Sequence, residues 1–194
     1  MPLTSSLAEF KQTIASGDPL SLAREFVFAV QVHALPSAAE YEAFRNRVCS
    51  HLPAAEHVSI VGSGNWRYSL NPDNHLSEYN PRSDIDVAVV SCALYEETWD
   101  EMRRIHRDRW YALDYSTKSK LMRKGQDVYS GFACPVWIPE KGHPKVYAFK
   151  SMLNKLSGPA IGYREVKMMY FKNEVEMIDY YRRGFTIAKR GITT

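Results

Sequence analysis

The feature that most constrains this chain is an apolar, strand-like run that begins with two aspartates. Residues 83–90 read SDIDVAVV. The part from 85 to 90 predicts a buried β-strand, because β-branched side chains suit a pleated surface that is covered by other elements. Aspartate disfavours strands, and a buried carboxylate is costly without a cation or another partner. We therefore interpret Asp84 and Asp86 as functional residues.

The spacing of the two aspartates places them on one face of the predicted strand. Side chains two residues apart point the same way, roughly 6–7 Å apart at the backbone. Ile85, Val87 and Val89 are expected to point into the opposite layer. Hard divalent cations such as Mg²⁺ require rigidly held carboxylate oxygens, and two acids on one strand face can supply them.

A second short strand, 57–61, is predicted to run directly into Gly62-Ser63-Gly64. Glycine at 62 lets the backbone approach a phosphate closely, and Ser63 adds a hydroxyl group. Alone, a Gly-Ser turn after a strand is usually only a turn. Followed by the aspartate pair on the next strand, it indicates a site that seats the β- and γ-phosphates of a nucleotide.

Val61-Gly62-Ser63, a loop and residues 83–90 together resemble the signature of the polymerase-β-like nucleotidyltransferase superfamily. The resemblance covers 61–90, and it reaches the C-terminal strand and helix if these are included. It implies a short mixed β-sheet backed by helices. It also implies a Mg²⁺-dependent enzyme that moves a nucleoside monophosphate from an NTP such as ATP to an acceptor, with release of pyrophosphate.

The resemblance assigns roles to individual residues. Asp84 and Asp86 would ligate two Mg²⁺ ions, and the reaction would be an in-line attack on the α-phosphate. The triphosphate would be held by a set of small and basic residues, namely Gly62, Ser63, Ser83 and Arg67. The acceptor could be a nucleic acid such as tRNA, a nucleotide or a protein.

Active members of the superfamily usually carry a third carboxylate on a later strand, which often serves as the base. The strand predicted at 164–171 offers Glu165 for this role, although Lys167 lies on the same strand face and cannot bind Mg²⁺. Asp127 is the competing acid. The third acid is therefore Glu165, Asp127 or absent.

The segment between the two motifs also departs from the family pattern. It is longer than in small members, and Arg67 and Tyr68 stand near the position of a second glycine. Its proline and asparagine content predicts an irregular, exposed loop over 68–82 that could cover a substrate. Tyr68 and Tyr79, close to the predicted site, are the best candidates among the aromatic residues to stack on a base.

Two functions remain as alternatives to an active transferase. The uncertain third acid also fits a catalytically silent nucleotidyltransferase fold that binds nucleotide, RNA or a protein. By analogy with small bacterial members, the chain could also be one component of a toxin–antitoxin or defence system.

The rest of the chain predicts one α/β (α+β) domain over 1–194, with an N-terminal helical extension at 1–36 and a core at 37–194. Asp18 is expected to cap a helix over 20–33, and Ser37 with Glu40 to cap the next one. Apolar spacing predicts the remaining elements, which are helices over 7–14, 94–106, 147–156 and 174–190 and a strand over 164–171.

Composition adds weaker constraints. The net charge is +3, and 103–124 is the most basic stretch, either a solvated helix face or a contact surface for phosphate or nucleic acid. The three cysteines lack zinc-site spacing.

No apolar run reaches the roughly 20 residues that cross a bilayer, and residues 1–6 do not resemble a signal peptide. We therefore expect a cytoplasmic protein without membrane contacts.

Overall fold

Strand β2 (Ile85–Val90) is an inner strand of a four-stranded mixed sheet, as its apolar run predicts. The computed structural model describes residues 6–140 and 142–193, and within these the sheet order is β1-β2-β4-β3. The other strands are β1 (His57–Val61), β3 (Phe132–Ala133) and β4 (Val166–Phe171). Strand β2 runs antiparallel to β1 and parallel to β4, so the expected α/β fold class with a short mixed sheet is confirmed.

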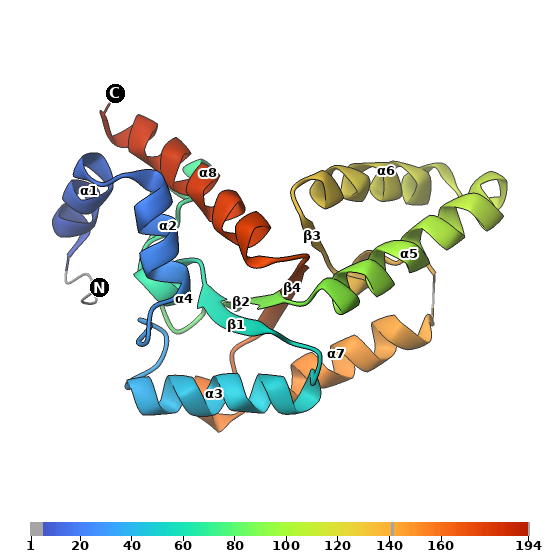
Figure 1. The fold of residues 1–194 in the computed structure, drawn as a ribbon, viewed down its shortest axis with the longest axis horizontal. Helices are drawn as coiled ribbons and strands as arrows, with labels where there is room; N and C mark the ends of the chain where they lie inside the picture. Colours follow the sequence, from blue (N-terminus) through green and yellow to red (C-terminus); the bar gives the residue numbers. More distant parts are fainter. Residues whose placement is uncertain (1–5, 141, 194) are drawn as a thin grey trace.

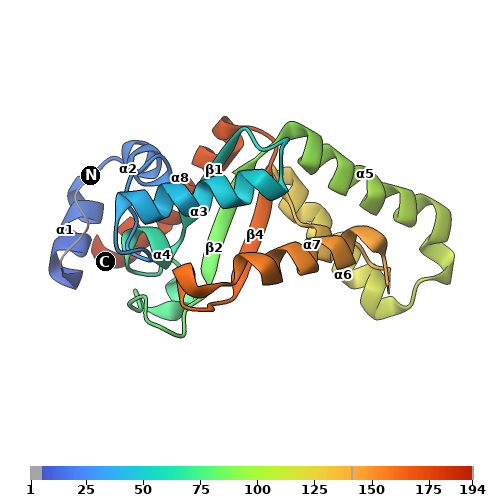
Figure 2. The same cartoon turned by 90° about the horizontal axis from the view of Figure 1, so that it is seen from below.

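The side chains of β2 alternate between two apolar cores, one on each face of the sheet. Ile85, Val87 and Val89 point into the core beneath α3 (Ala38–His51) and α7 (Pro144–Leu156). Figure 2 shows these two helices side by side across that face. Ala88 and Val90 point into the opposite core. The predicted alternation is confirmed, and it assigns Asp84 and Asp86 to the second face.

Helix α8 (Glu174–Thr193) covers that second face, and the two N-terminal helices pack against it (Figure 1). These are α1 (Leu7–Ser16) and α2 (Pro19–Val27). The rings of Phe26 and Phe185 stack with their centroids 5.5 Å apart. Helices α1 and α2 therefore share one apolar core with α8 and the sheet.

The predicted helix starts are confirmed by their caps, but α2 is shorter than expected. The Asp18 carboxylate accepts a hydrogen bond from the Ser21 N–H, and the Ser37 hydroxyl accepts one from the Glu40 N–H. Helix α2 ends at Val27 and not at His33. At this end the carbonyls of Phe26 and Val27 accept hydrogen bonds from Asn65 Nδ2 at 2.7 Å and Ser59 Oγ at 2.5 Å, so groups from elsewhere in the chain replace a further helical turn.

Helices α5 (Cys92–Arg109) and α6 (Tyr115–Tyr129) form an arm that projects from the end of β2 (Figure 1). A separate apolar cluster, Met102, Ile105, Leu121 and Ile138, joins the two helices. The sequence predicted part of α5 but not α6. The reason is that Leu121 is the one fully buried side chain within α6, so an apolar period hardly exists there.

The remaining described segments are short. One-turn helices are α4 (Ser63–Trp66), η1 (Pro72–Asn74), η2 (Trp110–Ala112), η3 (Pro135–Trp137) and η4 (Pro159–Ile161). Helix α7 starts at Pro144, three residues before the predicted start, because His143 caps it. None of the helices in the described ranges is long and apolar enough to cross a membrane.

Asn65 links three elements around the Gly-Ser turn, and its removal should destabilise the fold. The side chain is 2% exposed, and its Nδ2 donates to the carbonyls of Phe26 at 2.7 Å and Ile60 at 2.8 Å. Asn65→Ala leaves two carbonyls without this donor and should lower the free energy of unfolding by about 2–4 kcal/mol. Urea unfolding measures this change.

The matched control is Asn46→Ala, because Asn46 is an exposed asparagine on α3. This substitution should change the free energy of unfolding by less than about 0.5 kcal/mol. Equal effects of the two substitutions would contradict the role assigned to Asn65.

Candidate functional site

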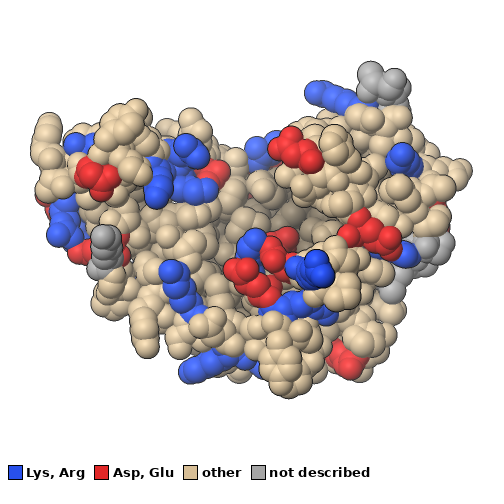
Figure 3. Space-filling model, turned by 180° about the vertical axis from the view of Figure 1, so that it is seen from behind, with Lys and Arg blue, Asp and Glu red and all other residues tan. Residues whose placement is uncertain are grey.

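A cleft of about 830 Å³ lies where the end of β1 meets the start of β2 beneath α8. Figure 3 shows a face of the molecule that is hollowed between the arm and the part carrying α8, with acidic and basic side chains gathered beneath the hollow. The residues that line the cleft include Gly62, Ser63, Arg82, Ser83, Asp84, Asp86, Tyr180, Tyr181 and Arg183. Five predicted site residues thus meet in one cavity.

Asp86 lies directly against the backbone of Gly62. A Cβ atom built on Gly62 would lie 2.9 Å from Asp86 Oδ2, and Gly62 has a φ of +67°. Any other L-residue at 62 would be both strained and in collision with the carboxylate. Glycine is therefore required here because it lets the turn and the acid share this space.

The Asp86 carboxylate has no hydrogen bond or ion pair with any described residue, although it is largely withdrawn from solvent. Burial, and then the charge of Asp84, raise the pKa of Asp86, while Lys167 opposes this shift. A partly buried carboxylate without a donor is destabilising. It is also a group that gains from an added cation.

Asp84 differs from Asp86 because it already has a cationic partner. Its carboxylate forms an ion pair with Lys167, whose pKa is raised chiefly by this hydrogen bond. In the parallel pairing of β2 with β4, Lys167 lies opposite Asp86. The strand position beside the acid pair is therefore a lysine, and this ammonium group partly neutralises both carboxylates.

The predicted phosphate-binding turn is one turn of helix. Gly62 precedes α4, Ser63 is its first residue, and both line the cleft. Ser83 also lines the cleft, and its hydroxyl accepts a hydrogen bond from the Asn80 N–H at 3.1 Å. Both predicted serines thus line the same cleft as the acid pair.

The prediction that Tyr68 and Tyr79 could stack on a base is wrong. Tyr68 is 4% exposed and packs on Phe10, with ring centroids 5.1 Å apart. Tyr79 is 9% exposed, its hydroxyl accepts a hydrogen bond from Arg164, and burial raises its pKa to about 12. The loop is polar elsewhere, but these two rings anchor it to the core, so they are not available to a ligand.

Three other predicted residues do not line the cleft. Arg67 is bound to Glu78, with Nε 2.7 Å from Oε1. Glu165 is exposed just before β4, and Asp127 pairs with Lys124 on α6 at 3.0 Å. Arg67 and Asp127 are thus bound to other partners. Glu165 lies on the chain beside the acid pair, because the Ile85 N–H donates to its carbonyl at 2.8 Å where β2 meets β4, but its side chain is exposed and outside the cleft lining.

Several residues at the cleft were missed in the sequence. Arg82 and Arg183 bring positive charge, and Glu78 is a third carboxylate in the lining. The Trp66 indole N–H and the Tyr181 hydroxyl are buried in the wall without a hydrogen-bond partner among the described residues. Residues 180, 183, 184 and 187 recur at helical spacing, so they share one face of α8. This spacing is the sequence signal that could have identified the helix as part of the cleft wall.

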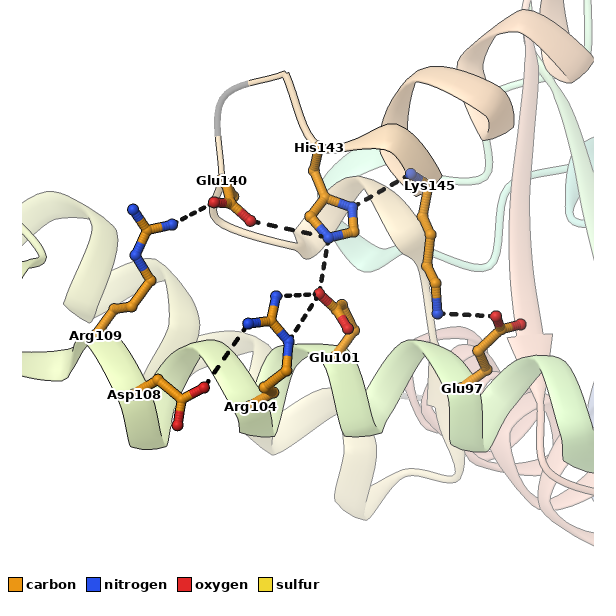
Figure 4. A network of polar contacts seen from close by, with 8 residues as sticks. All are labelled: Glu97, Glu101, Arg104, Asp108, Arg109, Glu140, His143 and Lys145. Atoms are coloured by element: carbon orange, nitrogen blue, oxygen red, sulfur yellow. Dashed lines mark hydrogen bonds and ion pairs between the residues drawn. The ribbon is translucent and has the colours of Figure 1, made fainter.

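A second polar cluster lies on the arm and has a different character (Figure 4). Glu101, Glu140 and His143 offer ligand atoms within 4.8 Å of one another. Both acids are already paired, Glu101 with Arg104 and Glu140 with Arg109. Arg104 lowers the pKa of Glu101 to about 2. This network fastens the start of α7 to α5, and its acids, unlike Asp86, have cationic partners.

Comparisons with protein-family models, with curated proteins and with solved structures give no match for this chain. Its function is therefore inferred from the geometry of the cleft. The contrast between the two acidic clusters is informative, since arginines satisfy the one on the arm while Asp86 in the cleft has no partner.

The raised pKa of Asp86 has a consequence for stability. A carboxylate whose pKa is higher in the folded state destabilises the fold where it is ionised, and this penalty disappears as the pH falls through that pKa. Asp86→Asn should therefore raise the free energy of unfolding at pH 7 by about 0.5–2 kcal/mol in EDTA, as substitutions at strained functional sites often do. The gain should shrink towards pH 4, which urea unfolding at several pH values would show.

Asp73→Asn is the control, because Asp73 is an exposed acid of the loop outside the cleft lining. It should leave the stability and its pH dependence unchanged. A loss of stability in Asp86→Asn at pH 7 would show that the carboxylate has a stabilising partner in the protein.

Proposed function

We propose that this protein is a Mg²⁺-dependent nucleotidyltransferase that transfers a nucleoside monophosphate from an NTP to an acceptor and releases pyrophosphate. The observation that carries the proposal is the partnerless Asp86 carboxylate beside Asp84 in a cleft built on the Gly62-Ser63 turn. The resemblance of 61–90 to the polymerase-β-like superfamily supports the same assignment.

The acid pair fits a hard divalent cation. Asp86 offers oxygen ligands that no described residue engages. Asp84 offers a carboxylate whose one ion-pair partner in the described ranges is the half-exposed Lys167. When bound, Mg²⁺ would neutralise charge on the phosphates and on the attacking oxygen. The two acids would hold the cation, and Lys167 would then be free to turn towards a phosphate oxygen.

The surroundings of the pair suit a triphosphate. The glycine at 62 lets the Asp86 carboxylate lie against the turn, and the hydroxyls of Ser63 and Ser83, which line the same cleft, can donate to phosphate oxygens. Arg82 and Arg183 also line the cleft, where their guanidinium groups would offset the phosphate charge, Arg183 after leaving Asp179. Arg67 could contribute only after leaving Glu78.

A second candidate function is nucleotide binding without transfer. Lys167 favours this second function, because it lies opposite Asp86 on β4. Active members of the superfamily that the chain resembles usually carry a third acid on such a later strand. Glu78 is the other carboxylate that lines the cleft, and it is bound to Arg67. Binding of Mg²⁺-NTP without pyrophosphate release would identify this second function.

The transferase is tested by Mg²⁺-dependent pyrophosphate release from each NTP, with and without total RNA and cell lysate as sources of acceptor. Asp84→Asn and Asp86→Asn should each lower the rate on the order of a hundredfold or more, because each removes charge needed by the cation. Asp73→Asn should retain full activity, since Asp73 lies outside the cleft lining.

The same assay identifies the third acid. A loss of activity in Glu78→Gln, with Glu165→Gln unaffected, would assign the role to Glu78, and the reverse would restore the assignment to Glu165. Pyrophosphate release that persists in Asp84→Asn and Asp86→Asn would contradict the proposed active site.

Lys167 competes with a cation for Asp84, which gives a prediction that does not depend on turnover. Its side chain is 55% exposed, so the ion pair is worth about 0.2–1 kcal/mol. Lys167→Met should therefore tighten Mn²⁺ binding by about 1.4- to 5-fold, as measured by electron paramagnetic resonance of free Mn²⁺. Lys150→Met, at an exposed lysine on α7, is the control. Weaker Mn²⁺ binding in Lys167→Met would show that the lysine supports the metal site.

A further inference from the structure

Helix α6 carries a stripe of large exposed side chains. Tyr115, Met122 and Tyr129 are 86%, 64% and 93% exposed. They are spaced by seven residues, so they lie almost in line along one face of the helix, over roughly 21 Å. Isolated exposed aromatic residues are common, but three large exposed side chains in line on one helix are more than scattered exposure.

The stripe is bordered by cations that lack acidic partners. Lys118 and Arg123 flank it on its two sides by helical spacing, and neither has an ion pair with any described residue. Lys118 instead lies over the ring of Trp110, with Nζ 5.4 Å from the centroid. Arg107 on α5 is likewise unpaired within the described ranges, whereas Arg103, Arg104, Arg109 and Lys124 are each bound to an acid.

An apolar groove adjoins the stripe between α5 and α6. It has a volume of about 300 Å³, and Met122 and Arg107 both line it. The other lining residues are mainly apolar or aromatic and include Trp99, Met102, His106 and Leu121. Exposed rings, a shallow apolar groove and unpaired cations thus occupy one surface of the arm.

We propose that this surface, formed by Tyr115, Met122, Tyr129, Lys118, Arg123 and the adjoining groove, binds single-stranded nucleic acid. Unpaired bases stack on exposed aromatic side chains without regard to sequence, while lysine and arginine beside them contact the phosphates. A duplex is not expected, because its bases are already stacked. A second copy of this chain fits poorly, since a two-fold contact would bring the same unpaired cations together.

The position of the surface relates it to the cleft. Helix α6 ends at Tyr129, and the hydroxyl of the next residue, Ser130, lies 3.3 Å from Nη1 of Arg183. Arg183 lines the cleft. A strand lying along α6 would therefore be led towards the acid pair. The binding itself does not depend on the proposed transferase activity, because it needs neither Mg²⁺ nor NTP.

The test is fluorescence anisotropy of labelled 12-nucleotide single strands, of RNA and of DNA, titrated with the full chain in EDTA. Tyr115→Ala/Tyr129→Ala should raise Kd at least about tenfold through lost stacking. Lys118→Gln/Arg123→Gln should reduce the magnitude of the salt dependence, d log K/d log [salt], by about 1.4, from two lost phosphate contacts. Comparing the two oligonucleotides shows whether the 2′-hydroxyl matters.

Matched controls test whether binding depends on this surface or on exposed aromatic and basic residues in general. Tyr147→Ala removes an equally exposed tyrosine on α7, and Lys150→Gln removes an exposed lysine of that helix. Both should bind as the wild type does. The double variant Asp84→Asn/Asp86→Asn should also bind the labelled single strands, whether or not it retains transferase activity. Failure of the transferase proposal would therefore not change the expected binding.

Three results would overturn the proposal. The first is no measurable binding of either single strand at low salt by the wild-type chain. The second is equal Kd values for the wild type and Tyr115→Ala/Tyr129→Ala. The third is a dimer of the wild type that becomes monomeric in the tyrosine variant, which would assign the stripe to self-association.

Discussion

The structure depends on the register of β2, a strand that must fill two apolar cores and also present two carboxylates. Its pairing with β1 places Val61 opposite Asp86, and its pairing with β4 places Lys167 opposite the same residue. The Gly-Ser turn and the lysine are thereby brought to the acid pair from both sides. A slip of one residue would turn Asp86 into the core beneath α3, so burial of the valines and assembly of the site are enforced together.

The elements around β1 hold the Gly62-Ser63 turn in place, whereas the partly buried charge of Asp86 destabilises the fold. The Tyr41 hydroxyl accepts a hydrogen bond from the Ile60 N–H at 3.1 Å, and Asn65 ties α4 to α2 and β1. These buried polar contacts are fully paired and fix the backbone that faces the carboxylate. Asp86 differs, since burial raises its pKa and no described residue donates to it, and the Trp66 indole N–H and Tyr181 hydroxyl in the same cleft also lack partners among the described residues. A local cost of this kind, on a rigid support, is what a cation-binding site requires.

The sequence was a good guide where local pattern and tertiary packing agree. Strands β1 and β2, the Asp18 and Ser37 caps and the long C-terminal helix were all predictable, because each combines an apolar period with a boundary residue. Helix α6 was not, because it packs through few apolar side chains. The end of α2 was also missed, because its last carbonyls accept hydrogen bonds from Ser59 and Asn65, far along the chain. At the site, Asp84, Asp86, Gly62, Ser63 and Ser83 do meet. Arg82, Arg183 and Glu78 were missed because a loop and a distant helix bring them to the cleft, and no local pattern encodes that contact.

We propose that Asp84 and Asp86 together hold a divalent cation beneath the phosphates of a nucleotide. The most direct measurement is a crystal structure of the protein grown with Mn²⁺ and a non-hydrolysable NTP, with anomalous scattering used to locate the metal. We expect an anomalous peak within coordination distance of both carboxylates, with the triphosphate against Gly62 and Ser63 and the Lys167–Asp84 ion pair broken. Nucleotide bound elsewhere, or an intact Lys167–Asp84 pair with no metal at Asp86, would contradict it.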